Sequence, residues 1–150
     1  MTDIVLSTLN ARYIHSSFGL RYLKANLHEL KERSVLAEFI IDVKPEDAVE
    51  TILVHQPIIV GFGVYIWNVV QTERVVSLLR AVAPDVKIVL GGPEVSYELE
   101  GQSIISHVDH VVTGWGEKSF YDLCKHLLMV ETQEVLPKVI VGQQLALKEM

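Results

Sequence analysis

Cysteine is nearly missing from this sequence. The 150 residues include one cysteine, Cys124, which excludes an internal disulfide. A single thiol also cannot build the multi-cysteine sites that hold structural zinc or an iron–sulfur cluster. Because Cys124 falls on an apolar helical stripe with Phe120, Leu123 and Leu127, we expect it to be a packing residue.

Long apolar runs and excess positive charge are missing too. No apolar run reaches the ~18 residues that a membrane span needs, and residues 1–3 lack the basic flank of a signal peptide. The formal net charge is -6, and no cluster of lysine and arginine offsets it. We therefore expect a cytoplasmic protein that binds neither membranes nor nucleic acid.

The common catalytic motifs are also missing. The sequence has no nucleophile elbow, P-loop or dinucleotide fingerprint. A phospho-receiver domain is excluded, because the places of its acidic residues hold Asn10 and the turn at 63–65. Flavin binding stays open as an alternative, since Ser16 and Ser17 precede an expected helix and can hold a phosphate.

What the sequence does contain is an uncharged stretch, residues 57–68, around which the chain is organised. Its apolar part does not alternate with polar residues, which predicts a strand covered on both faces of a parallel sheet. Pro57 is tolerated only at the start of such a strand. Asn68 suits a helix N-cap, with Gln71 completing a capping box. The stretch should deliver a loop, 63–67, at the carboxyl edge of a central strand, where open α/β sheets bind ligands.

Strands and helices are expected to alternate along the chain. Apolar runs predict five strands, at 3–9, 35–41, 57–65, 86–90 and 109–113. Helical stripes fall between and after them, at 20–33, 45–55, 69–83 and 117–127, with two short helical pieces in 95–107. Short connections predict one doubly wound α/β domain with a parallel five-stranded sheet of order 2-1-3-4-5. Residues 135–141 can form a further strand.

Glycines lie in or directly after three of the expected strands. They come in pairs at positions 61 and 63, 91 and 92, and 114 and 116. Glycine at a strand end allows a ligand to approach the backbone closely. Three strand ends treated alike favour a broad, flat ligand, and aromatic residues near them are suited to wall it: Tyr13, Tyr65, Trp67 and Trp115.

Four segments at this edge carry a resemblance. They read TLNARYIH at 8–15, GFGVYIWN at 61–68, GGPEVS at 91–96 and GWGE at 114–117. In this order and spacing they resemble the N-terminal cobalamin-binding domain of cobalamin-dependent radical SAM enzymes. That group includes methyltransferases and proteins related to the anaerobic magnesium-protoporphyrin ester cyclase. The resemblance covers residues 1 to about 130.

The resemblance implies a flavodoxin-like (Rossmann-like) fold that holds the corrin ring over the strand edge, with the nucleotide tail running into the sheet. By position, it implies these cofactor-binding residues: Asn10, Arg12, Tyr13, Gly61, Gly63, Val64, Tyr65, Gly91, Gly92, Pro93, Thr113 and Gly114. The family often has a hydroxyl residue where this chain has Gly63, and a glutamate where it has Trp115. We expect Gly92→Leu to abolish tail binding and to leave the fold intact.

The resemblance also places the catalysis elsewhere. Radical SAM chemistry needs three closely spaced cysteines, so S-adenosylmethionine and a [4Fe-4S] cluster would belong to a separate, C-terminal domain. We expect residues 1–130 to bind cobalamin in support of methyl transfer or a related radical reaction, and 131–150 to be a linker. The chain would then be an excised domain or a stand-alone carrier, with no catalytic centre of its own. The alternative is a non-enzymatic interaction domain of the same fold that binds no cofactor.

Histidine is not expected to bind metal here. His107 and His110 straddle a helix–strand junction with no third ligand nearby. Histidine-on cobalamin domains use an Asp-x-His-x-x-Gly loop after the first strand, and Arg12 stands where that histidine would be. An arginine stays protonated and cannot act as a neutral ligand. We therefore expect cobalamin bound with its own base displaced and without His15 as a replacement.

Overall fold

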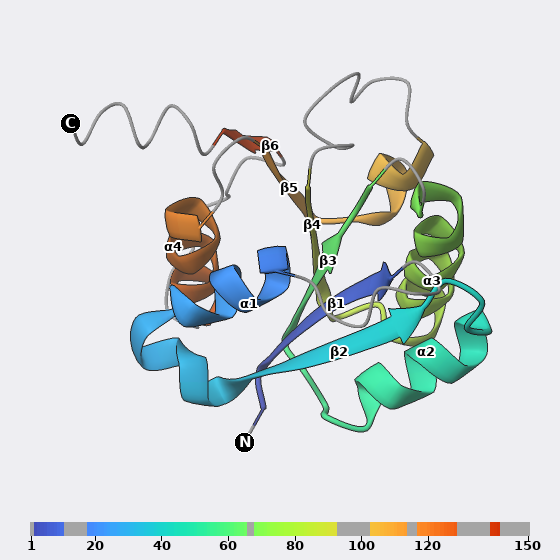
Figure 1. Cartoon of the computed structure of the whole chain (residues 1–150), viewed down its shortest axis with the longest axis horizontal. Coiled ribbons are helices and arrows are strands. Elements are labelled where there is room, and N and C mark those ends of the chain that lie inside the picture. The colour runs from blue at the N-terminus through green and yellow to red at the C-terminus, as the bar shows by residue number, and fades with distance from the viewer. Residues whose placement is uncertain are drawn as a thin grey trace.

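The computed structural model of this chain describes residues 2–10, 18–65, 68–92, 103–113, 117–128 and 139–141. These ranges form a parallel sheet with helices on both faces (Figure 1). Within them, no helix combines the length and apolar character required to cross a membrane.

In the described ranges, six strands form the sheet in the order β2-β1-β3-β4-β5-β6, and each neighbouring pair is parallel. Their bounds are β1 Ile4–Asn10, β2 Ser34–Ile40, β3 Ile59–Gly63, β4 Lys87–Gly91, β5 His110–Thr113 and β6 Val139–Val141. The first five strands confirm the predicted doubly wound order. The short β6 adds a strand to the five-stranded prediction and lies within the range expected to be a linker.

The central strands β1 and β3 are covered on both faces, as their lack of alternation predicts. All seven residues of β1 are buried, and so are the first four of β3. The register pairs Thr8 with Gly63 and Gly63 with Gly91. A row of small residues therefore crosses the carboxyl ends of β1, β3 and β4.

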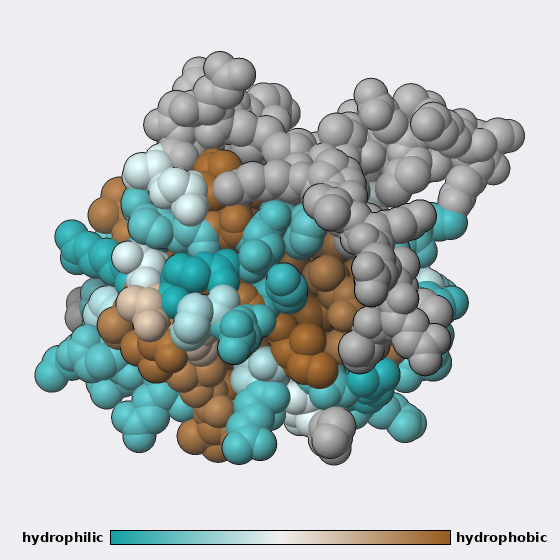
Figure 2. Space-filling view, turned by 180° about the vertical axis from the view of Figure 1, so that it is seen from behind, coloured by the Kyte–Doolittle hydropathy of each residue, from teal (hydrophilic) through white to brown (hydrophobic). Residues whose placement is uncertain are grey.

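Two pairs of helices cover the two faces of the sheet (Figure 1). Helices α1 (Phe18–Ala25) and α4 (Glu117–Leu128) lie on one face, and α2 (Pro45–Leu53) and α3 (Val69–Val82) lie on the other. Each pair packs on the sheet through its own apolar core. Seen from behind, polar side chains cover much of the surface and apolar ones gather toward its middle (Figure 2).

The first predicted helix, residues 20–33, is not one continuous α-helix. The α-helix ends at Ala25, and a 3₁₀ helix, η1 (His28–Arg33), follows it. The side chain of Asn26 donates to the Tyr22 carbonyl oxygen at 2.8 Å and so competes with the backbone for this acceptor. The predicted leucine stripe nevertheless packs into one core, because the 3₁₀ turn keeps Leu27 and Leu30 buried beside α1.

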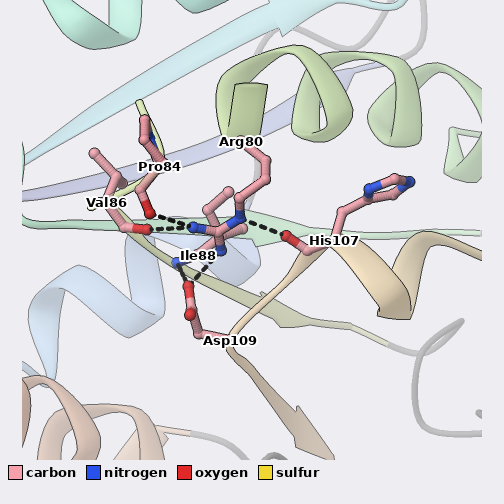
Figure 3. Close-up of polar contacts among 6 residues, drawn as sticks. All are labelled: Arg80, Pro84, Val86, Ile88, His107 and Asp109. Atoms are coloured by element: carbon pink, nitrogen blue, oxygen red, sulfur yellow. Dashed lines mark hydrogen bonds and ion pairs between the residues drawn. The ribbon is translucent and has the colours of Figure 1, made fainter. Parts of the chain in front are cut away.

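Arg80 ties α3 to the amino ends of β4 and β5 (Figure 3). Its guanidinium lies 2.5 Å from the Asp109 carboxylate. It also donates to three backbone carbonyl oxygens, each at 3.0 Å: those of Pro84, Val86 and His107. The amino edge of the sheet is thus closed by structural hydrogen bonds, and the candidate site lies at the opposite edge.

Candidate functional site at the carboxyl edge of the sheet

The structure brings the glycines predicted for the site to one edge. Gly63 ends β3 and Gly91 ends β4, and these two residues are partners in the parallel ladder. Strand alternation puts Gly61, Gly63 and Gly91 on the face that α1 and α4 cover. Four predicted site residues lie outside the described ranges: Arg12, Tyr13, Pro93 and Gly114. Thr113 is described only through its backbone, at the end of β5.

The glycines of this face differ in the space beside them. Among the described residues, a Cβ on Gly91 would approach only the Val112 carbonyl oxygen, at 3.8 Å. A Cβ on Gly63 would meet Thr8 Oγ1 at 3.5 Å, an ordinary contact. A Cβ on Gly61 would lie 3.2 Å from the Phe120 ring, tighter than usual. The open part of the face is therefore its outermost row.

Gly92 has a different role from Gly91. Its φ is +118°, a conformation that L side chains rarely adopt, and a Cβ there would lie 2.4 Å from the Val64 carbonyl oxygen. The Val64 N–H donates to the Gly91 carbonyl oxygen at 2.8 Å, which holds the two loops together. The positive φ and the close Val64 backbone therefore favour the other possibility, that the turn needs glycine at position 92 and that Gly92→Leu lowers stability.

Asn68 ties three parts of the edge together. Its Oδ1 accepts a hydrogen bond from the Tyr65 N–H at 2.8 Å. Its Nδ2 donates to the Leu9 carbonyl oxygen at 3.0 Å and lies 3.4 Å from Thr8 Oγ1. Asn68 makes no side-chain cap of α3, so the predicted capping box with Gln71 is wrong. The fully buried amide instead joins the end of β1 to the turn after β3.

Thr8 lies at this edge but is not among the site residues that the sequence predicted. Its side chain is fully buried and donates to the Gly63 carbonyl oxygen at 2.8 Å. The resembled family often has a hydroxyl residue at the position of Gly63. In this chain the hydroxyl lies instead on the neighbouring strand, at Thr8. No local signal marks Thr8, because its partners are 55 and 60 residues away in the chain.

The predicted polar residue Asn10 turns toward the edge strand β2. It is 5% exposed, and its Nδ2 donates to Glu38 Oε1 at 3.3 Å. Glu38 also pairs with Arg21 of α1 at 3.2 Å. This chain of contacts fixes where the first strand ends and where α1 lies above it.

Where shifted pKa values occur in the described residues, they lie on α1, η1 and α4 rather than on the glycine row. Burial raises the pKa of the Cys124 thiol, and the residue is fully buried in the core, as predicted. No group of three or more His, Cys, Asp or Glu residues that could hold a metal occurs in the described ranges. The arrangement is suited to binding a flat molecule.

Comparisons with known proteins agree with this geometry. The model of a family described as "B12 binding domain" matches residues 4–124. A solved cobalamin-binding protein from Desulfitobacterium hafniense DCB-2 is similar to 85% of this chain, with 20% identity and a TM-score of 0.62. The radical S-adenosylmethionine methyltransferase TsrM from Kitasatospora setae is similar to 92% of it, with 16% identity and a TM-score of 0.74. No curated protein matches the sequence significantly.

At these identities the two solved structures show a shared fold. This chain spans 59% of the first protein and 28% of the second.

Proposed function

Because this chain belongs to the family of B12-binding domains, we propose that it holds cobalamin at the carboxyl edge of its sheet, in support of methyl transfer or a related radical reaction. The observation that carries the proposal is the row Thr8, Gly63 and Gly91. In this row two glycines lie beside one buried hydroxyl, that of Thr8. The row is at the strand ends where α/β sheets bind ligands.

The residues of this row fit a cofactor with a wide ring and a narrow tail. Among the described residues little lies beside Gly91, so a flat group can approach the backbone there. Gly63, its partner in the ladder, adds no side chain to the middle of the row. The remaining predicted contacts come from the loops that follow β1, β4 and β5. These include Arg12, Tyr13, Pro93 and Gly114.

The chain's own contribution is to bind and orient the cofactor. When bound, cobalamin supplies a cobalt centre that can carry a methyl group or take part in radical chemistry. Asn68 and Thr8 hold the turn after β3 against the end of β1, so this part of the site is fixed before a ligand arrives. We infer that no histidine of this chain ligates the cobalt, since Arg12 takes the place of that ligand in the sequence.

The partner we propose is a radical SAM catalytic domain. It would carry the S-adenosylmethionine and the [4Fe-4S] cluster, for which this chain has one cysteine only. TsrM, a longer methyltransferase of which this chain spans 28%, supports such an arrangement by likeness of fold. The substrate would be bound by that domain.

Reconstitution tests cobalamin binding directly. The purified protein is mixed with hydroxocobalamin, desalted, and examined by visible spectroscopy. We expect a coloured protein fraction with about one corrinoid per chain and saturable titration. Parallel incubation with a flavin mononucleotide tests the flavin alternative. A colourless fraction from a folded protein would contradict cobalamin binding and favour an interaction domain without a cofactor.

A further inference from the structure

We propose that Phe120 forms the floor of the nucleotide-tail site and makes the domain prefer corrinoids that carry a base at the end of their tail over those that lack it. This inference rests on the proposed cobalamin function and adds to it a residue that determines specificity. Phe120 lies in the first turn of α4 and is 4% exposed.

The position of the ring follows from Gly61. On the face under α1 and α4, a Cβ at Gly61 would lie 3.2 Å from Phe120 Cζ and 3.3 Å from Cε1. It would also lie 3.3 Å from Leu6 Cδ2. The edge of the Phe120 ring therefore occupies the space where a side chain of residue 61 would be, and little room remains above Gly61.

The next row of the sheet is built differently. Two residues further along each strand, the same face carries Thr8, Gly63 and Gly91 in register. A Cβ on Gly63 or Gly91 would meet no atom of the described residues closer than 3.5 Å. The part of this face without bulky side chains therefore extends over one row. The distance along the strands from this row to the next is roughly 6–7 Å, two residues at about 3.3 Å each, and Phe120 occupies the next row.

The chemistry of this floor favours an aromatic base. The ring belongs to an apolar core with Leu6, Val89 and Val112. A flat apolar base gains stacking or edge contact with Phe120, whereas a base with unpaired polar groups would lose hydrogen bonds to water there. The benzimidazole of cobalamin is flat and mostly apolar, with one ring nitrogen as an acceptor, and cobinamide, which lacks the nucleotide, makes no contact with the floor.

Paired titrations with cobalamin and cobinamide test the proposal. The variants are Phe120→Leu and Phe120→Met, which have similar volumes and lack the ring; the flexible Met side chain can fill part of the gap and so protects the fold. Each titration measures Kd by visible spectroscopy, and each variant's Tm is recorded. We expect both variants to weaken cobalamin binding by about threefold to tenfold and to leave cobinamide binding unchanged.

Phe62→Leu is the matched control. Phe62 is 2% exposed and lies on the same sheet, in the core of the opposite face. It should lower Tm comparably and leave the ratio of the two Kd values unchanged. If the Phe120 variants weaken both corrinoids equally, or neither, Phe120 is only a core residue and the proposal is wrong. If the wild-type protein binds neither corrinoid, the proposed cobalamin function itself falls, and this inference falls with it.

Discussion

Gly91 and Gly92 are adjacent, yet different physical demands account for them. A Cβ on Gly91 would meet only the Val112 carbonyl oxygen among the described residues, while Gly92 combines a φ of +118° with the Val64 carbonyl oxygen 2.4 Å from where its Cβ would lie. The first glycine is therefore free to serve a ligand, and the second is required by the turn. Substitutions at the two positions should separate binding from stability.

We expect Gly91→Leu to bind hydroxocobalamin more than about tenfold more weakly, a loss of about 1.4 kcal/mol, with little change in Tm. The branched side chain would fill the open row without strain, because Gly91 has no positive φ. Gly91→Ala, which adds only the Cβ, should retain more of the affinity. Visible titration and thermal unfolding measure the two effects.

Gly92→Ala is the comparison for this pair. Forcing an L residue into this conformation should cost about 1–3 kcal/mol of stability, seen as a lower Tm. If Gly91→Leu bound cobalamin with undiminished affinity while folded, the cofactor would not lie on this row.

At the scale of elements, α3 is fastened at both ends to the strands beside it. Asn68, just before the helix, holds the end of β1, and Arg80, in its last turn, holds the starts of β4 and β5. Both ends of α3 are thus held against the sheet. The position of the turn after β3 therefore depends on the packing of α3 as well as on the turn itself.

Arg80→Leu should lower the free energy of unfolding by about 1–2 kcal/mol. The loss removes the Arg80 donors from three backbone carbonyl oxygens and from the Asp109 carboxylate, which keeps its hydrogen bond from the Ile88 N–H at 2.8 Å. Partial exposure of both charged side chains also keeps the effect moderate. Chemical denaturation measures it. Arg74→Leu, an exposed arginine on the same helix, is the control and should change stability little. Equal stability of the two variants would mean that the Arg80 contacts contribute nothing.

For the whole molecule, the proposed function predicts the electronic state of bound cobalt. Cob(II)alamin on the protein should show no nitrogen superhyperfine splitting in its EPR spectrum, because we expect neither its own base nor a histidine at the lower face. His15→Ala should leave the spectrum unchanged. A triplet splitting that disappears in His15→Ala would make His15 the axial ligand and contradict the assignment.

The sequence by itself determined the fold class and the edge at which the site is proposed. Apolar runs without alternation report burial on both faces, and glycines at strand ends report close backbone approach; both signals are local. The alternation of strands and helices predicted the order of the first five strands, and a helical apolar stripe predicted the packing role of Cys124. The resemblance of four short segments then pointed to the family.

Only the tertiary structure decided what individual residues do at that edge. Asn68 has the sequence position of a helix cap, but its Oδ1 accepts from the Tyr65 N–H, and its Nδ2 lies against β1, 59 and 60 residues away. Gly61 and Gly63 look alike in sequence, and the ring of Phe120 distinguishes them. The physical reason is the same in both cases: a local pattern reports how a segment is buried, whereas hydrogen-bond partners and free space depend on distant segments that only folding brings together.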